Sequence, residues 1–426
     1  MRCEPLASSA VRPSATLATD ELIRQRLAAG RQVLHLGFGE AGLPVHPSLR
    51  EVLADSASIN GYGPVAGSPE VRGSAAGYFD RRRLPTDPDL VVTAPGSKPL
   101  LFALIAALAG DVVLPAPSWV TYAAQSALLG RRVIRVPVSP GTGGVPDPAQ
   151  LTTALERATA DRLEPRILIV TVPDNPTGLM ATEAQLRQVC QIAEEHDLVI
   201  ISDEIYRDLA YDQDRFLSPA ELAPGRTVIT SGLSKNLALG GWRTGFARLP
   251  DSPLGRRLLP DVLGVASEIW SCLARPMQAV AAYALTEPAE LVAHVGRSRA
   301  LHRAVALAAH RVFVDAGAKC HQPQAAFYLY PDLQAWRPLL ERSGIETGRE
   351  LAAFLLDRLD VAVLAGEAFG DDVGAMRFRA ATSLLYGDTD EERWQALDSA
   401  DPAALPWVAR KLDALRAALE KLSTSA

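Results

Sequence analysis

Short runs of apolar, mostly β-branched residues recur along the chain, and stretches with helical spacing separate them. The runs span residues 90–93, 111–114, 132–138, 167–172, 198–202 and 227–230. Between them, segments such as 182–195 place apolar residues on one face of an amphipathic helix. Strands that alternate with helices indicate βαβ units and a mostly parallel central sheet flanked by helices. We therefore predict an α/β fold, in which ligands bind at the carboxyl ends of the strands.

The pattern changes after about residue 297, which predicts a second, smaller α+β domain. Long helices are expected over about 298–316 and 404–422, with short strands within 326–330, 361–364 and 376–379. A chain of 426 residues is long enough for two domains. We expect an N-terminal arm with part of the small domain, a large domain and a small C-terminal domain, at residues 1–60, 61–297 and 298–426.

Composition and charge restrict the partners of the chain. With 48% hydrophobic and 22% charged residues it has the profile of a soluble globular protein, and its net charge of −6 argues against a nucleic-acid-binding surface. The longest apolar run, 100–109, is too short to span a bilayer, and residues 1–10 lack the apolar core of a signal peptide. Four cysteines without metal-ligand spacing fit a reducing compartment. We expect a cytoplasmic protein with no nucleic-acid, membrane or metal partner.

One lysine, Lys235, stands among small residues shortly after the run at 227–230. Formation of a Schiff base with an aldehyde requires an accessible amine of this kind. Eight positions later, Arg243 follows a Gly-Gly-Trp turn and offers a planar, charged fork that suits phosphate. The pair predicts an aldehyde-bearing phosphorylated cofactor, pyridoxal phosphate (PLP). The segment alone is equally compatible with a surface lysine and arginine beside a glycine loop.

Polar residues also follow two other predicted strands. Gly96–Pro99 opens the apolar helix after the run at 90–93, with Ser97 as the expected N-cap. Free amides at such a helix start can bind an anion. Asn175 begins an Asn-Pro-Thr-Gly turn and places a carboxamide at the end of the run at 167–172. An ordinary capped helix and an ordinary turn remain alternatives for these segments.

Asp203 emerges directly from the apolar run at 198–202, where an unpaired carboxylate is costly. A protonated pyridine nitrogen would pair with it, and that proton makes the ring an electron sink. The alternative for Asp203 is a helix N-cap. Tyr206 could reach the same ligand, and Trp119, at another strand end, could face a planar ring. Either aromatic could instead be a packed core residue.

Together these motifs resemble the class I/II aminotransferases of fold-type I, the aspartate aminotransferase superfamily, from about Val11 to the final helix. Gly232–Lys235 with Gly240–Arg243 resembles the Schiff-base motif, Asn175–Gly178 the cofactor turn and Asp203–Tyr206 the segment with the pyridine-binding Asp. The resemblance implies PLP-dependent transfer of an amino group from an amino acid to a 2-oxo acid through a Lys235 Schiff base.

The resemblance also implies roles for individual residues. Catalysis falls to Lys235, Asp203 and Tyr206. The cofactor would be bound by Gly96, Ser97, Lys98, Trp119, Asn175, Asp203, Tyr206, Ser234, Lys235, Arg243 and, from the neighbouring subunit, Tyr62. The substrate would contact Gly39, Asn175 and Arg377, the last at the position that binds the α-carboxylate. A tyrosine shared across subunits implies a homodimer with shared active sites.

The chain departs from the family pattern after Arg377, where Arg379-Ala380 replaces a small residue and a tyrosine. It also has Gly39-Glu-Ala41 where the family often has Gly-Glu-Pro. Strand alternation puts Arg377 and Arg379 on one face. We therefore hypothesise a second cation near the substrate, which would favour an acidic, phosphate-like or otherwise polar substrate. A salt bridge of Arg379 within the small domain is the alternative.

Two other functions use the same motifs. A PLP-dependent lyase, cyclase or oxidase acting on an amino-acid derivative in specialised metabolism would need the same residues, and a requirement for a 2-oxo acid would separate it from a transaminase. A ligand-sensing regulator of this fold would usually carry a DNA-binding domain. The resemblance starts near Val11 and the chain is acidic, so the regulator is not favoured.

Overall fold

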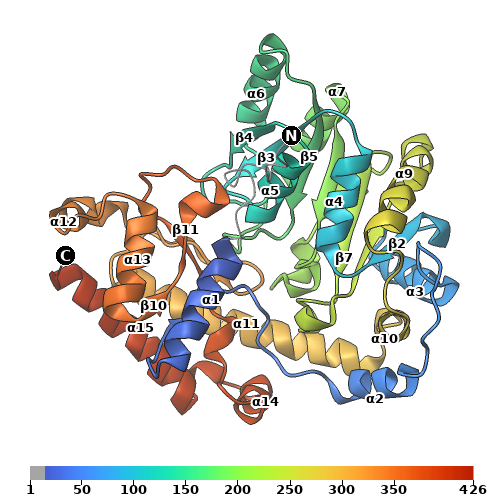
Figure 1. Cartoon of the computed structure of the whole chain (residues 1–426). Coiled ribbons are helices and arrows are strands. Elements are labelled where there is room, and N and C mark those ends of the chain that lie inside the picture. The colour runs from blue at the N-terminus through green and yellow to red at the C-terminus, as the bar shows by residue number, and fades with distance from the viewer. Residues whose placement is uncertain (1–14, 426) are drawn as a thin grey trace, which may run out of the picture.

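A seven-stranded sheet is the central layer of the computed structural model, which describes residues 15–425 (Figure 1). Its strands are β2 (Val91–Ala94), β3 (Asp111–Ala116), β4 (Val133–Pro137), β5 (Pro165–Thr171), β6 (Val199–Asp203), β7 (Thr227–Gly232) and β8 (Gly245–Arg248). They lie in the order β2-β8-β7-β6-β5-β3-β4. Strand β8 is antiparallel to β2 and β7, and the remaining neighbours are parallel. The predicted α/β fold is confirmed, although β8 was not among the expected strands.

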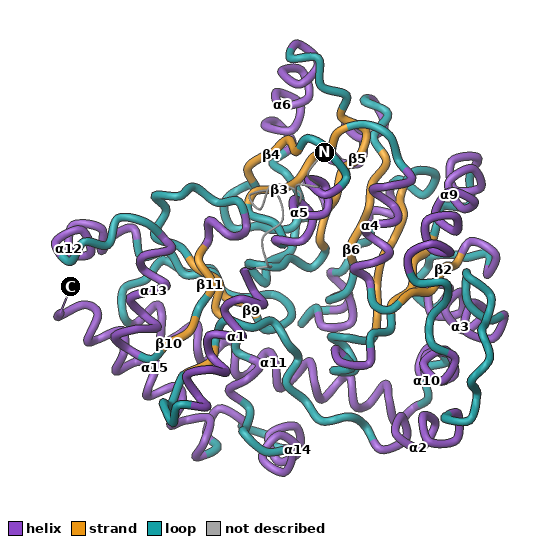
Figure 2. The backbone as a smooth tube through the Cα atoms, viewed as in Figure 1, coloured by secondary structure: helices purple, strands orange, loops and turns teal. Residues whose placement is uncertain are grey.

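Helices cover both faces of this sheet (Figure 2). One face carries α4 (Ser97–Ala107), α5 (Val120–Leu128) and α9 (Pro253–Ile269), and the other carries α6 (Pro148–Ala160), α7 (Glu183–Glu195) and α8 (Pro219–Leu222). Val112 and Val113, adjacent on β3, belong to different apolar clusters because alternate side chains point to opposite faces. Burial on both faces explains why the strands read as nearly continuous apolar runs.

A third apolar cluster lies beside β2 and β8. It is built by α2 (Pro47–Ser56), α3 (Pro69–Asp80) and α10 (Arg275–Leu285), which pack on one another. Residues of these helices meet Phe246 of β8 and Leu233, two positions before Lys235. The segment that carries Lys235 is therefore supported from behind by this cluster.

The C-terminal part contains α11 (Ala289–Asp315), two small sheets and further helices. Helix α11 has 27 residues and begins earlier than expected. The other elements are β9 (Tyr328–Leu329), α12 (Arg337–Arg342), α13 (Gly348–Leu359), β10 (Val361–Ala362), β11 (Leu364–Ala365), β12 (Phe378–Ala381), α14 (Asp390–Asp398) and α15 (Pro406–Ser425). Strands β11, β12 and β9 form an antiparallel sheet in that order.

The N-terminal residues contact both parts of the molecule. Helix α1 (Ala15–Ala28) and β1 (Leu34–His35) lie with the C-terminal part, and β1 pairs in parallel with β10. Helix α2 instead packs on α10 beside the large sheet. The N-terminal segment thus runs from the C-terminal part to the large sheet, as expected of an arm. The exact domain boundaries stay a prediction.

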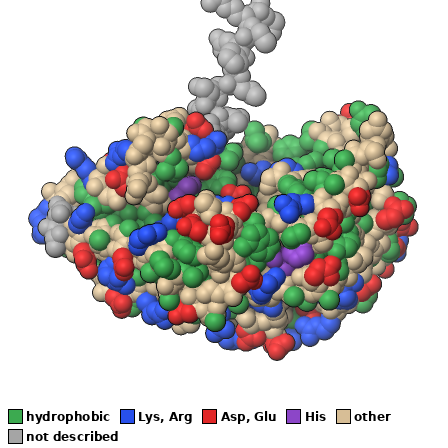
Figure 3. All heavy atoms as spheres, turned by 90° about the horizontal axis from the view of Figure 1, so that it is seen from below, with side chains coloured by type: hydrophobic (Ala, Val, Ile, Leu, Met, Phe, Trp, Pro, Cys, Tyr) green, Lys and Arg blue, Asp and Glu red, His purple; other side chains and the backbone are tan. Residues whose placement is uncertain are grey.

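Acidic and basic side chains are interspersed on the face seen from below in Figure 3. Within residues 15–425 no helix is both long enough and apolar enough to cross a membrane. The apolar run at 100–109 is mostly in α4, a buried helix as expected. The segment 1–10 and Val11 lie outside the described residues.

Candidate active site

A cavity of about 490 Å³ lies at the carboxyl ends of β5, β6 and β7. Most of the residues singled out from the sequence line it, although they come from distant segments. They are Gly39, Ser97, Lys98, Trp119, Asn175, Asp203, Tyr206, Ser234, Lys235 and Arg243. The fold therefore brings the separate strand-end motifs together, as expected for a parallel sheet.

Lys235 reaches into this cavity from the segment after β7. Its Nζ donates a hydrogen bond to the backbone oxygen of Gly39 and lies 5.9 Å from the centre of the Tyr206 ring. Burial, and then the nearby Arg379, lower the pKa of Lys235 to about 8. With this pKa a much larger fraction of the amine is neutral near physiological pH than for an ordinary lysine, and the neutral form can act as a nucleophile or a base.

Asp203, the last residue of β6, lines the cavity and is 2% exposed. Its carboxylate accepts hydrogen bonds from the Tyr122 hydroxyl at 2.8 Å and from the Ile205 amide at 3.3 Å. Burial raises the pKa of Asp203 to about 6. No cationic side chain of residues 15–425 pairs with it. The helix N-cap alternative is wrong, because the short helix that follows begins after Tyr206.

The start of α4 and Arg243 form a cationic corner. Gly96 precedes α4 with φ of 89°, so Gly96, and not Ser97 as predicted, is the N-cap. The positive φ favours glycine at this position, and a Cβ on Gly96 would push the Arg243 guanidinium aside. A Cβ on Gly245 would likewise overlap the Gly96 backbone. Gly96 thus stands behind the cavity wall, and the free amides of α4 lie beside Arg243, as an anion site requires.

Aromatic side chains surround the space between Lys235 and Asp203. The hydroxyls of Tyr206 and Tyr328 are 2.8 Å apart, and Lys98 Nζ lies 5.3 Å from the centre of the Trp119 ring. Burial, and then Arg243, lower the pKa of Lys98. Tyr122 and Tyr328 were not singled out from the sequence. Their hydroxyls form hydrogen bonds with residues of distant segments, and the residues next to them in the chain give no sign of this.

The two arginines near the C-terminal strand β12 have different environments. Arg379 is 1% exposed and donates to Asn175 Oδ1 at 3.1 Å and to the Gly37 oxygen at 2.7 Å. It lines the cavity and has no ion-pair partner among the residues that the structure describes, so the alternative of a salt bridge within the small domain is wrong. Burial lowers the pKa of Arg379.

Arg377, which was expected to contact the substrate, does not line the cavity. Its side chain is 36% exposed and pairs with Asp371 at 3.2 Å and Asp332 at 3.6 Å. The prediction that Arg377 lies in the substrate site is therefore wrong. Arg377 lies just before β12, beside two carboxylates, whereas Arg379 lies inside the strand opposite Leu364 and is directed inward.

Tyr62 does not line the cavity of its own chain. It is 92% exposed, on the loop between α2 and α3. The expected contact of Tyr62 with the cofactor of a neighbouring subunit therefore stays a prediction.

Comparison with known proteins gives consistent matches over most of the chain. A family profile described as aminotransferase class I and II matches residues 31–384. The aspartate/prephenate aminotransferase of Cereibacter sphaeroides is 32% identical, with 84% of this chain and 90% of that protein covered. The aspartate aminotransferase of Geobacillus stearothermophilus is 31% identical, with 89% and 95% covered. The structure of aspartate aminotransferase from Thermus thermophilus with maleate matches with a TM-score of 0.83 and 26% identity, covering 98% of this chain and all of that one.

Proposed function

The chain belongs to the class I and II aminotransferases, and from this premise we propose roles for its individual side chains and a class of substrate. The family resemblance inferred from the motifs is confirmed, as are the fold-type I architecture, the PLP cofactor and the transfer of an amino group from an amino acid to a 2-oxo acid. The relatives give no support to a lyase, cyclase or oxidase.

The cavity fits pyridoxal phosphate in three respects. It holds a buried amine of lowered pKa in Lys235. It holds a buried carboxylate, Asp203, that lacks a cationic partner among residues 15–425 and so suits a protonated ring nitrogen. It holds an anion site where α4 begins beside Arg243. When bound, the cofactor supplies an electron sink conjugated to the substrate's α-carbon.

Each of these residues then has a distinct task. Lys235 Nζ would hold the cofactor's aldehyde carbon, and its free amine would take the proton from the substrate's Cα. Asp203 keeps a proton on the ring nitrogen, and the hydrogen bond from Tyr122 orients its carboxylate. Tyr206 and Asn175 would contact the ring hydroxyl, and Trp119 would pack on the ring. Ser97, Ser234 and Arg243 would hold the phosphate, whereas Gly96, which was expected to bind the cofactor, does not line the cavity.

Arg379 carries the proposal for the substrate. A fully buried guanidinium that faces Lys235 and lacks a carboxylate partner within the described part of the chain is a site for the substrate's α-carboxylate. Asn175 fixes its direction at 3.1 Å, and Gly39 lines the same space. Arg379 thus takes the role first expected of Arg377.

Lys98 supplies a further cation on the Trp119 side of the cavity. Its amine lies near Arg243, and no carboxylate of residues 15–425 pairs with it. We assign Lys98 to a second carboxylate of the substrate, rather than to phosphate as first expected. The related enzymes named for aspartate, and the Thermus structure with the dicarboxylate maleate, support a dicarboxylic amino acid such as aspartate as the donor.

The remaining assignments rest on the family. We propose a cytoplasmic homodimer in which Tyr62 reaches the phosphate of the partner's cofactor. We also propose that residues 61–297 form the large domain, with the small domain built from 298–426 and part of 1–60.

The test is the absorption of the purified, PLP-loaded protein. Aspartate alone should abolish the band of the lysine-bound cofactor, and a 2-oxo acid should restore it. Lys235→Ala should lose both changes, whereas Lys319→Ala, an exposed lysine outside the cavity, should keep them. Full turnover by Lys235→Ala would refute the assignment, and turnover without any 2-oxo acid would indicate elimination instead of transamination.

A further inference from the structure

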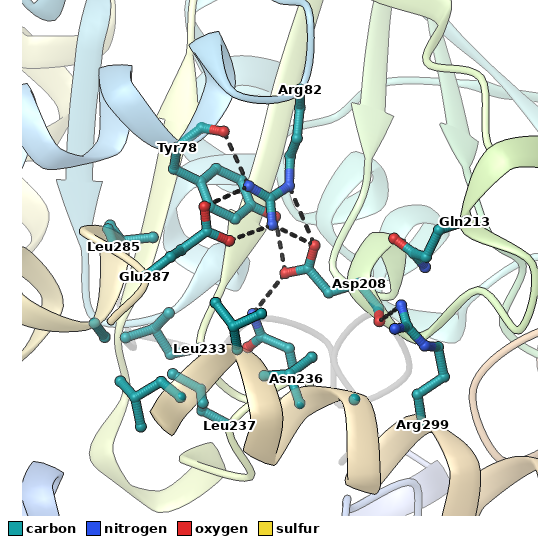
Figure 4. A pocket seen from close by; sticks show the side chains of 15 residues that line it. Tyr78, Arg82, Asp208, Gln213, Leu233, Asn236, Leu237, Leu285, Glu287 and Arg299 are labelled. Carbon is teal, nitrogen blue, oxygen red and sulfur yellow. Dashed lines mark hydrogen bonds and ion pairs between the residues drawn. The ribbon is translucent and has the colours of Figure 1, made fainter. Parts of the chain in front are cut away.

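A second cavity, of about 260 Å³, lies behind the segment that carries Lys235 (Figure 4). Its walls come from α3, α10, α11, the short helices after β6, and residues 233–237. Ser234 and Lys235 line the active-site cavity, whereas Leu233, Asn236 and Leu237 line this second one. One short segment therefore separates the two cavities.

Most charges in the second cavity neutralise one another. Arg82 pairs with Asp208 at 2.8 Å and Glu287 at 2.6 Å, and its guanidinium lies 3.5 Å from the centre of the Tyr78 ring. Tyr78 and Asn236 donate to the same Asp208 oxygen, at 3.0 Å and 2.8 Å. Figure 4 shows this group gathered on one side of the cavity. Because these charged groups pair with one another, this side of the cavity does not need a ligand to neutralise its charges.

Two groups on the cavity wall are left incomplete. Asn236 is 9% exposed, and its Oδ1 is buried with no hydrogen-bond partner. A buried acceptor without a donor is costly, so a ligand that donates to it would be stabilised. Arg299 of α11 donates only to the backbone oxygen of Asp208, at 3.3 Å, and forms no ion pair within the described part of the chain. Its guanidinium is therefore available to bind a carboxylate.

The other walls are apolar. Leu233, Leu237, Leu291 and Val295 line the cavity, and Val292 stands at its rim with 54% of its surface exposed. A ligand for this site needs a carboxylate for Arg299, a hydrogen-bond donor for Asn236 and an apolar body. The lining itself is balanced, with Arg82 and Arg299 against Asp208 and Glu287. A balanced lining suits a zwitterion better than an anion.

We propose that this second cavity binds a free amino acid with an aliphatic side chain, distinct from the substrate of the active site. Its ammonium group donates to Asn236 Oδ1, its carboxylate pairs with Arg299, and its side chain packs against Leu237 and Val295. Because Asn236 follows Lys235 directly, an occupant would stiffen the segment that positions the lysine. The binding site itself does not depend on the roles proposed for the active-site residues.

Equilibrium dialysis of radiolabelled L-leucine against the PLP-loaded enzyme tests this site. Arg299→Gln should weaken binding about tenfold or more, because a hydrogen bond to a charged group is lost. Arg303→Gln is the matched control, since Arg303 lies one turn further along α11 and does not line the cavity. Val295→Phe, which fills the space without changing charge, should also abolish binding.

Arg379→Gln separates the two cavities. It should leave leucine binding unchanged, because Arg379 lines only the active-site cavity. Loss of binding in Arg379→Gln with full binding in Arg299→Gln would place leucine in the active site and overturn the proposal. Absence of saturable binding to the wild-type enzyme would overturn it as well. Both results are independent of whether aspartate proves to be the donor.

Discussion

Replacement of Arg379 by glutamine tests which arginine anchors the substrate. Arg379 is 1% exposed, and no carboxylate of residues 15–425 pairs with it. A substrate carboxylate bound there would form a desolvated, hydrogen-bonded charge pair. Truncating one partner of such a pair typically costs about 2–5 kcal/mol. At about 1.4 kcal/mol for each factor of ten, kcat/KM should fall roughly 30-fold to several thousand-fold.

Arg377→Gln is the matched control, because it removes the same charge two residues away. Its side chain is 36% exposed and already paired with Asp371 and Asp332. Ion pairs that reach solvent contribute about 0–1 kcal/mol, so kcat/KM should change less than about fivefold. The measurements are kcat/KM for aspartate and for the 2-oxo acid, together with the affinity for maleate, a dicarboxylate that does not react. A large loss in Arg377→Gln with a small one in Arg379→Gln would refute the reasoning.

Three further predictions concern the other charged groups of the cavity. Lys98→Met should lower kcat/KM for aspartate roughly 10- to 100-fold more than for phenylalanine, because only the acidic substrate loses an ion pair; equal losses would return Lys98 to the phosphate. In the cofactor-free protein, burial raises the pKa of Asp203 to about 6, above its unfolded value, so its contribution to stability is present at low pH and lost as pH rises from about 4 to above 6. Asp203→Asn should therefore gain on the order of 3 kcal/mol relative to wild type over that range in denaturant unfolding, and parallel pH curves would contradict this. The lowered pKa of Lys235, about 8, predicts that the rate of cofactor capture by the apoenzyme, followed by absorbance, rises with pH with a midpoint near 8 and levels off above it. A midpoint above 10 would show an ordinary, solvated lysine.

Local pattern was sufficient to predict most of the central sheet. Each β-branched run became a strand, because burial on both faces selects continuous apolar segments. Strand β8 was missed because Gly245–Arg248 is short, begins with glycine and ends with a charge. Ser97 was misassigned as an N-cap because the local pattern does not reveal the positive φ of Gly96, which lies close to Arg243 and Gly245.

The long-range hydrogen bonds that orient the site residues could not be predicted from the sequence. Tyr122 meets Asp203 from 81 positions away, and Arg379 meets Asn175 across 204 positions. Neither pair shares a helix face or a strand, so no spacing rule connects them. Likewise, nothing in the sequence indicates that Asn236 faces a cavity on the opposite side from Lys235.

Local sequence is enough to predict the chemistry of this protein: an amine for an aldehyde, a carboxylate for a ring nitrogen and an anion site, each at the end of a strand. These features are local, because a strand end and its next few residues form one continuous segment. Contacts between distant segments of the folded chain determine that Arg379, and not Arg377, faces Lys235, and that a second cavity lies behind the lysine. Strand alternation places both arginines on one face, so the choice depends on where β12 begins and which carboxylates lie beside it.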